Sequence, residues 1–357
     1  MQQLKRVAVV IPGIMGSCLE RDSRTELWTE DIRANYRRLV TNPAVLQYHG
    51  TAAKAPRVME AIRFPLGIWK VHLLGRLLQF LRNHPSFSHK LGVLTFAYDW
   101  RESVATSAQN LGRFLRQKLS ALLSKQRCGL TFVTHSMGGL VARVALMEEH
   151  VNRSFVEKVI HIAPPFLGSA AAFRSIFHKC NLPLIEDFIW LCYGLKNGSL
   201  ALENFRGVLS SFPSMYELMP PVREEFLYIG AAGMTNPLAA PHVVIDAAMR
   251  KQARHVHQRI RSSLGQLPKW GIEAHTIYAT GGPDQTDETY KVFEDAAHYE
   301  VLEPVPYAAT DRGDGTVTAR SCTFDGRDTA NSREVVGEKH AYMCNSKKVI
   351  EILATLI

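Results

Sequence analysis

Short apolar runs alternate along this chain with longer stretches whose apolar residues recur at helical spacing. Residues 7–11 are apolar and mostly β-branched, which is typical of a strand buried on both faces of a parallel sheet. Further strands are predicted at residues 92–97, 130–133, 156–162, 274–279 and 333–336. Helices are predicted over residues 66–81, 104–125 and 346–357, and directly after Ser136. This alternation predicts an α/β fold with a mostly parallel, doubly wound sheet.

The stretch around Ser136 joins a strand to a helix through a very short turn. β-branched and aromatic residues run up to Ser136, and Met137, Gly138 and Gly139 follow at once. A serine at such a turn adopts a strained backbone conformation that lifts its hydroxyl above the sheet, and the glycines let the helix start close to the strand. The amide of Met137 would face an anion held at Ser136. We therefore predict that Ser136 is a nucleophile.

Two observations bear on this choice. The usual form of the turn is G-x-S-x-G, and Thr134 stands here in place of the first glycine. The position must be small because helix and strand cross closely there, and threonine is about the largest residue that fits. Ser263 also has a glycine two residues later, but it follows a basic helical stretch and no strand. Ser136 is therefore favoured over Ser263.

Candidate partners for this serine lie near the end of the chain. A hydroxyl needs a base to take its proton, and an imidazole base needs a third group to fix its tautomer. In α/β-hydrolases these groups follow in the order Ser, Asp, His, on loops after the last strands. His340 lies between the last predicted strand and the last helix. Asp314 is flanked by glycines, which favours it over the alternative, Asp311.

The alternation of strands and helices breaks between residues 170 and 270. We divide the chain into a first core part (1–169), an inserted cap or lid (170–270) and a second core part (271–357). The insertion opens with an apolar and aromatic cluster that includes Phe188 and Trp190. Such a cluster either packs the cap on the body or forms a wall for an acyl chain, and both readings are kept. Phe166, on a loop after a predicted strand, should also line the site.

The net charge of the chain does not by itself identify a binding partner. The formal net charge is +9, and residues 250–261 carry arginines beside an apolar stripe. Such a helix can lie on an anionic membrane, but an ordinary surface helix is the favoured reading. A nucleic-acid partner would rest on charge alone, so we expect none.

The cysteines lack the C-x-x-C spacing of a zinc site, so we expect reduced thiols, no metal and no cofactor. The N-terminal residues imitate a short signal peptide, but cleavage near Cys18 would remove a core strand. We assign them to the fold and expect a cytoplasmic or peripheral membrane protein, with export as the alternative. No run of 18 apolar residues predicts a membrane span.

Five segments in order resemble the signature segments of the lecithin:cholesterol acyltransferase family of α/β-hydrolases, which also holds lysosomal phospholipase A2 and the phospholipid:diacylglycerol acyltransferases. They are residues 10–20 (VIPGIMGSCLE), 98–101 (YDWR), 134–139 (THSMGG), 313–317 (GDGTV) and 338–340 (EKH). The resemblance implies an α/β-hydrolase fold with Ser136 as nucleophile, Asp314 as acid and His340 as base.

The resemblance also implies that the backbone amides of Ile14 and Met137 form an oxyanion hole, although an ordinary strand-end turn is the alternative for residues 12–17. Trp28 resembles the tryptophan that begins the family's first insertion, but no cysteine pair surrounds it as in the secreted members. The prediction is a serine-dependent hydrolase or O-acyltransferase that acts on ester lipids through an acyl-serine, with phospholipids as the expected substrates. The alternatives are a catalytically silent binding module of the same fold and a carboxylesterase for soluble esters.

Overall fold

A six-stranded sheet forms the centre of the computed structural model. The structure describes residues 5–22, 25–64, 70–87, 91–123, 128–177, 205–229, 233–239, 245–282, 285–292, 305–310, 312–327 and 331–357. The strand order is β14-β11-β8-β7-β1-β6, and each pairing in this sheet is parallel. The strands are β1 (Lys5–Ile11), β6 (Val93–Thr95), β7 (Cys128–His135), β8 (Val156–Ile162), β11 (Glu273–Thr280) and β14 (Ser332–Val336). The predicted parallel, doubly wound α/β fold is confirmed.

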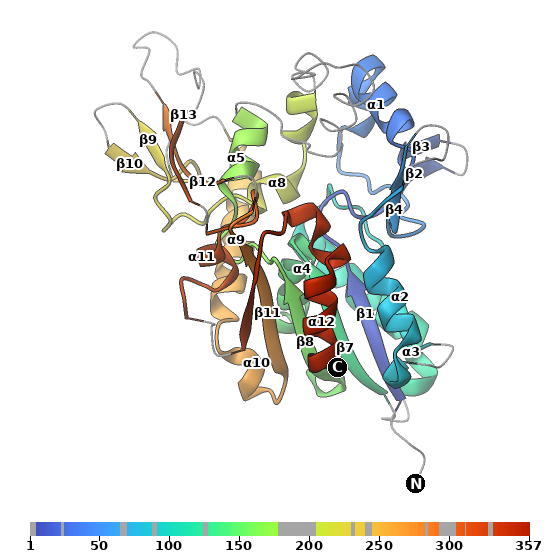
Figure 1. Ribbon diagram of the computed structural model, residues 1–357. Coiled ribbons are helices and arrows are strands. Elements are labelled where there is room, and N and C mark those ends of the chain that lie inside the picture. Colours follow the sequence, from blue (N-terminus) through green and yellow to red (C-terminus); the bar gives the residue numbers. More distant parts are fainter. Residues whose placement is uncertain are drawn as a thin grey trace.

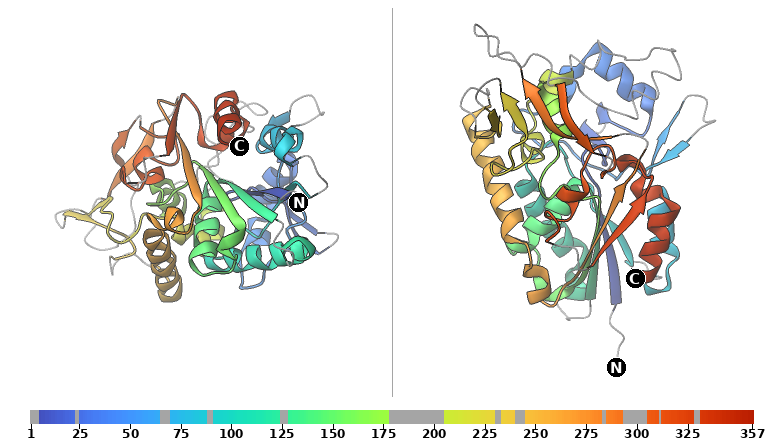
Figure 2. Two further views of the ribbon diagram at one scale, coloured as in Figure 1. Left: turned by 90° about the horizontal axis from the view of Figure 1, so that it is seen from below. Right: turned by 60° about the vertical axis from the view of Figure 1, so that its left-hand side comes forward.

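Helices cover both faces of this sheet (Figures 1 and 2). Helices α2 (Gly75–Asn83) and α12 (Lys347–Leu356) cover one face, where they pack with Ala8 and Val10 of β1. Helices α3 (Val104–Leu123), α4 (Met137–Met147) and α9 (Ala247–Ser262) pack with Val7 and Val9 on the other. Neighbouring residues of β1 thus enter different cores, which is why this strand is apolar throughout.

The helix predicted over residues 66–81 is shorter than its apolar pattern suggested. Residues 65–69 lie outside the described part of the chain, and Lys70–His72 form strand β5, which pairs with β4 (Ala61–Arg63). The amides of Leu73, Leu74 and Gly75 all donate to the carbonyl oxygen of Glu60. This turn holds the chain against β4, so the helix begins only at Gly75.

A second, smaller sheet lies beyond the carboxyl ends of the central strands (Figure 1). Its order is β10-β9-β12-β13, with β9 (Leu227–Ile229), β10 (Gly233–Thr235), β12 (Thr286–Val292) and β13 (Val305–Thr310). This small sheet takes strands from both sides of residue 270. The division of the chain at residues 170 and 270 stays a prediction.

Helix α9 lies alongside the body and packs against α4 and against α8 (Pro213–Glu217). Val256 and Ile260 of its apolar stripe are buried in the core. Arg250 and Arg254 donate to the carbonyl oxygens of Pro237 and Leu238. The apolar face of α9 therefore points inward, as in an ordinary surface helix. Within the described ranges, no helix combines the length and the hydropathy needed to cross a bilayer.

Helix α1 (Ile32–Thr41) and the hairpin of β2 (Leu19–Asp22) and β3 (Thr25–Trp28) lie above the central sheet, on the side opposite the small sheet (Figure 1). Asp31 is the N-cap of α1, and its carboxylate accepts hydrogen bonds from the amides of Arg33 and Ala34. This cap fixes the start of α1 directly after the hairpin.

Candidate active site

Ser136 occupies the turn between β7 and α4 in a backbone conformation that serine rarely adopts. Its φ is 52° and its ψ is −127°. Two main-chain hydrogen bonds hold it there, because its amide donates to Ile162 O (2.9 Å) and its carbonyl oxygen accepts from Gly139 N (2.8 Å). Such strain persists only where surrounding structure enforces it, and it is common at functional sites. The predicted strained turn is observed.

The glycines after Ser136 are required by close packing. A Cβ atom on Gly138 would lie 2.3 Å from the carbonyl oxygen of Ile11, and one on Gly139 would lie 3.0 Å from the Cβ of Pro164. Thr134 fits where a glycine is usual because its hydroxyl has a partner, the Nδ1 of His161 at 2.8 Å. The helix can therefore start directly against β1 despite this departure from the G-x-S-x-G pattern.

Of the three residues predicted as nucleophile, base and acid, His340 lies within hydrogen-bonding distance of the other two. His340 Nε2 lies 2.8 Å from Ser136 Oγ, and His340 Nδ1 lies 2.7 Å from Asp314 Oδ2. A neutral imidazole that donates from Nδ1 to the carboxylate can accept the serine proton at Nε2. Asp311, the alternative acid, lies outside the described residues.

The carboxylate of Asp314 is held from several sides. Its Oδ1 accepts from the amides of Thr316 (3.0 Å) and Val317 (2.7 Å), which leaves Oδ2 for His340. The amide of His340 donates to the carbonyl oxygen of Asp314 at 3.0 Å. Asp314 and His340 are thus linked through both their side chains and their main chains.

Residues 12–17 pass directly beside the serine. A Cβ atom on Gly13 would lie 2.8 Å from the Cβ of Ser136 and 3.3 Å from its Oγ, so only glycine allows this approach. Ile14 follows at once, and Met137 is the first residue of α4, where helix amides have no intrahelical acceptor. The two predicted oxyanion donors therefore lie on segments that meet at Ser136, and their function stays a prediction.

Three aromatic side chains brace this loop by donating to its carbonyl oxygens. The donors are Tyr98 Oη to Pro12 (2.7 Å), Trp28 Nε1 to Met15 (3.3 Å) and Trp100 Nε1 to Ser17 (3.0 Å). Two of these donors belong to the YDWR segment, for which the sequence suggested no function. Trp28 is buried, and its ring lies 5.7 Å from that of Trp100. Its observed contacts hold the loop, and a contact with substrate stays a prediction.

Residues 70–232 match the family model of lecithin:cholesterol acyltransferase. The resemblance predicted from the sequence is confirmed for this stretch, which we call the LCAT-like segment. It contains the YDWR residues, Ser136 and its turn, whereas Asp314 and His340 lie beyond it.

The α/β fold is supported by one of the following solved structures, which has a TM-score above 0.5. A chain of the Tle4–Tli4 complex has a TM-score of 0.64 at 13% identity, with 98% of this chain and 97% of that chain covered. The mature lipase BlEst2 of Bacillus licheniformis has a TM-score of 0.41 at 11% identity, with coverage of 99% and 92%. The phospholipase PlaB of Legionella pneumophila has a TM-score of 0.40 at 11% identity, with coverage of 89% and 45%. No curated protein matches the sequence.

Three residues predicted to contact substrate remain without support in the structure. Phe188 and Trp190 lie outside the described residues. Phe166 is buried. Its ring stacks on that of Phe324 (4.5 Å between centroids) and faces the guanidinium of Arg143 at 4.5 Å. These contacts build the core behind the turn, so a contact of Phe166 with substrate stays a prediction. Ser263, the alternative to Ser136 as nucleophile, is also buried, and its hydroxyl donates to Ile260 O.

His135, directly before Ser136, was not singled out from the sequence. Its Nε2 lies 3.0 Å from the carbonyl oxygen of His340, and the two ring centroids are 5.1 Å apart. Desolvation, with a smaller contribution from His340, lowers the pKa of His135 to about 3. The ring is therefore neutral at ordinary pH, and its single proton lies on Nε2, where it can be donated to that carbonyl.

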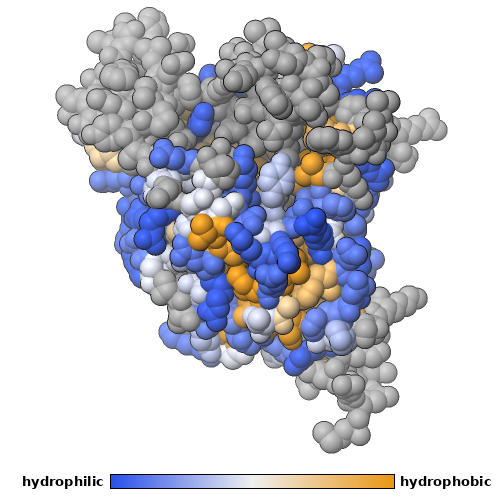
Figure 3. All heavy atoms as spheres, in the orientation of Figure 1, coloured by the Kyte–Doolittle hydropathy of each residue, from blue (hydrophilic) through white to orange (hydrophobic). Residues whose placement is uncertain are grey.

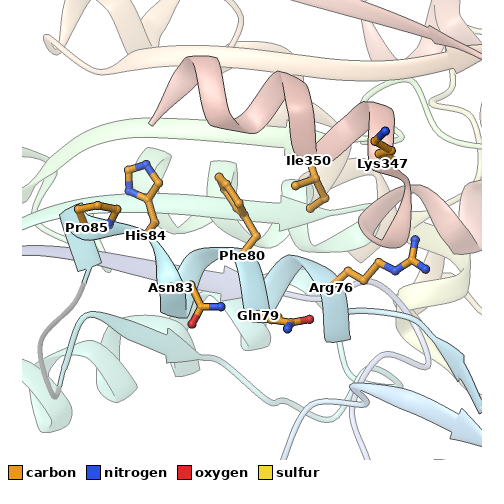
Figure 4. Close-up of a pocket in the computed structure, with 8 residues that line it drawn as sticks. All are labelled: Arg76, Gln79, Phe80, Asn83, His84, Pro85, Lys347 and Ile350. Carbon is orange, nitrogen blue, oxygen red and sulfur yellow. The ribbon is translucent and has the colours of Figure 1, made fainter.

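A surface groove of about 480 Å³ lies between α2 and α12, away from these residues. Apolar side chains gather on the face that carries α12 (Figure 3), and Phe80 and Ile350 point toward one another across the groove (Figure 4). At one end Arg76 donates to Asn345 O, and Lys347 pairs with Glu351. No residue of the Ser136 site lines this groove.

Within the described ranges, no three side chains of His, Cys, Asp or Glu are arranged to hold a metal ion. The described cysteines, Cys18, Cys128, Cys322 and Cys344, are free and buried.

Proposed function

We propose that this protein is a serine-dependent lipid acyl hydrolase or O-acyltransferase. The match to lecithin:cholesterol acyltransferase supports a lipid ester hydrolase or acyltransferase. The observation that carries the serine mechanism is the hydrogen-bonded series from Asp314 through His340 to Ser136, at distances of 2.7 and 2.8 Å. Phospholipids are the proposed substrates.

The proposed reaction has two halves. Ser136 Oγ attacks the ester carbonyl while its proton passes to His340 Nε2, and the resulting imidazolium is stabilised by Asp314. The amides of Ile14 and Met137 stabilise the negative oxygen of the tetrahedral intermediate. Collapse breaks the ester bond, and His340 gives the proton to the leaving lipid alcohol. Water or an acceptor alcohol then attacks the acyl-Ser136, with His340 again taking and returning the proton.

We propose that this chemistry takes place at a membrane surface. The support is the lipid class of the substrate and the net charge of +9, which favours anionic bilayers. Helix α9 adds nothing to this proposal, because its apolar stripe is buried against the body.

A fluorophosphonate probe tests the serine mechanism. We expect the wild-type protein to be labelled and the Ser136→Ala variant not to be, with a loss of turnover of a thousandfold or more. Labelling that persists in Ser136→Ala would reject the assignment, and no labelling of the wild type would favour the silent fold.

The same preparation tests the substrate. Mixed phospholipid vesicles with an added alcohol, analysed by mass spectrometry, should yield fatty acid or a new ester. Turnover restricted to short-chain soluble esters, and indifferent to vesicle charge and salt, would indicate a carboxylesterase instead.

A further inference from the structure

Thr286 is the first residue of β12 in the small sheet, and its side chain is only 1% exposed. It lies against the loop of residues 312–318, which carries Asp314 and which we call the acid loop. The amide of Gly315 donates to Thr286 Oγ1 at 2.8 Å. A Cβ atom on Gly313 would lie 2.3 Å from the same oxygen and 2.7 Å from Thr286 Cβ. Thr286 thus touches both glycines that flank the proposed acid, and no space for a side chain is left between Thr286 and Gly313.

The partner of Thr286 in the small sheet holds the same loop from its other end. Thr286 pairs with Thr310, the last residue of β13. Thr310 Oγ1 accepts a hydrogen bond from the amide of Arg312 at 3.1 Å. One cross-strand pair therefore supplies two hydroxyl acceptors to the loop, one before Asp314 and one after it.

The position of the Asp314 carboxylate depends on this loop. Its Oδ1 is fixed by amides of the loop itself, and its Oδ2 by His340. The carbonyl oxygen of Asp314, in the same loop, accepts a hydrogen bond from the amide of His340. A shift of Gly315 would therefore be passed to both contacts between acid and base.

We propose that Thr286 is a positioning residue for Asp314, through which the small sheet sets the geometry of the acid and base. This inference rests on the proposed function for its kinetic consequences. Strand β12 also packs against α5 (Ala170–Phe177), so the small sheet connects the loop of Asp314 to the start of the inserted region.

The test uses three variants of the full chain. Thr286→Val keeps the shape of the side chain but removes the acceptor, and Thr286→Ser restores it. Thr323→Val is the matched control, since Thr323 Oγ1 is also buried and also accepts a glycine amide, that of Gly326 at 3.2 Å, outside the acid loop. The measurements are the rate of Ser136 labelling, kcat and KM, thermal unfolding, and the proton NMR signal of His340 Nδ1–H.

A displacement of the order of 1 Å costs about a hundredfold in rate, so we expect Thr286→Val to lower the labelling rate and kcat by about 10- to 100-fold, with little change in KM. The downfield resonance of the proton shared by Asp314 and His340 should shift or broaden in Thr286→Val and stay in place in Thr286→Ser and Thr323→Val. Thr310→Val should lower the rate in the same direction.

Other outcomes overturn the inference. If Thr286→Val labels as fast as the wild type and keeps the resonance, Thr286 does not position the acid. Equal losses in Thr286→Val and Thr323→Val would indicate general destabilisation. If the wild type is not labelled, the proposed function fails, but the resonance still decides whether Thr286 holds the acid and base together.

Discussion

His135 contacts the main chain of His340 from the position directly before Ser136. Its Nε2–H is donated to the carbonyl oxygen of His340, while the amide of His340 donates to Asp314 O. The main chain of the base is therefore held on both sides. Because the pKa of His135 is lowered to about 3, the ring stays uncharged and would not repel the imidazolium that His340 becomes in the proposed reaction.

Removal of this donor should slow acylation more than it destabilises the fold. We expect His135→Leu to lower the rate of fluorophosphonate labelling by about 10- to 100-fold, because the base loses a fixed position and its carbonyl loses a partner. His135→Gln, which keeps an N–H donor, should recover much of the rate. Labelling rates and thermal unfolding of both variants check this. Equal rates in Leu, Gln and wild type would mean that the contact is incidental.

Ser136, Asp314 and His340 could be predicted because each stands in a recognisable local context. A strand and a helix flank the serine, glycines flank the aspartate, and the last strand and helix flank the histidine. His135 and Thr286 have no such signal. His135 meets its partner across 205 residues, and Thr286 meets Gly315 across 29. Such contacts depend on how strands and loops are brought together, which the local pattern does not determine.

The YDWR segment connects an edge of the central sheet to the loop of residues 12–17. Phe96 follows β6, and its ring stacks on Tyr98 at 5.4 Å with an interplanar angle of 11°. Asp99 and Arg101 form a buried ion pair at 2.6 Å, and Asp99 also accepts the amide of Ala53 at 2.7 Å. This rigid corner places the hydroxyl of Tyr98 against Pro12 O, next to the proposed oxyanion donor.

Tyr98→Phe removes only that hydroxyl and keeps the stacked ring. Loss of a direct oxyanion donor typically costs 100- to 1000-fold, so the loosening of the loop should cost less, about tenfold in labelling rate. Tyr216→Phe is the matched control, because its hydroxyl also donates to a backbone carbonyl, Ser210 O at 2.8 Å, away from this loop. A larger loss of labelling rate in Tyr98→Phe than in Tyr216→Phe would support the bracing of residues 12–17 by Tyr98. Equal losses in the two variants would reject it.

Periodicity predicted the existence of the strands and helices better than their limits. The predicted strand at residues 156–162 coincides with β8, and the final helix is observed within one residue of its predicted start. The helix predicted from residue 66 begins only at Gly75, because the carbonyl oxygen of Glu60 holds the preceding amides. The apolar residues upstream have the same spacing as those in the helix, so the sequence pattern could not separate them.

At the scale of the whole molecule, the central sheet could be predicted from the sequence, whereas the small sheet could not. The parallel sheet follows from the alternation of strands and helices, and its order is limited by right-handed crossovers. The small sheet pairs β9 with β12, which are far apart in the chain, and β9 is only three residues long. Such a short strand carries little periodic signal, so its pairing with β12 could not be predicted. Thr286 of β12 nevertheless supports the acid loop.

Buried ionisable groups should make the stability of the whole fold depend on pH at both ends. Desolvation lowers the pKa of His257 to about 4 and of His135 to about 3, from 6.5, so their contribution is present above pH 6.5 and is lost as pH falls toward 4 and 3. Desolvation raises the pKa of Glu102 to about 7 and of Glu217 to about 8, from 4.5. Their contribution is present below pH 4.5 and is lost as pH rises toward 7 and 8.

Glu217 allows a direct test of the alkaline side. Its carboxyl oxygens accept from Ser103 Oγ and from the amide of Val104, both at 2.6 Å, at the start of α3. Glu217→Gln mimics the protonated carboxyl, so this variant should gain stability relative to the wild type between pH 5 and 9. Each pKa unit corresponds to about 1.4 kcal/mol, so the relative gain should reach a few kcal/mol. Urea unfolding at both pH values measures it, with the exposed Glu351→Gln as control. If Glu217→Gln and the wild type lose stability in parallel up to pH 9, ionisation of Glu217 does not cause the alkaline loss.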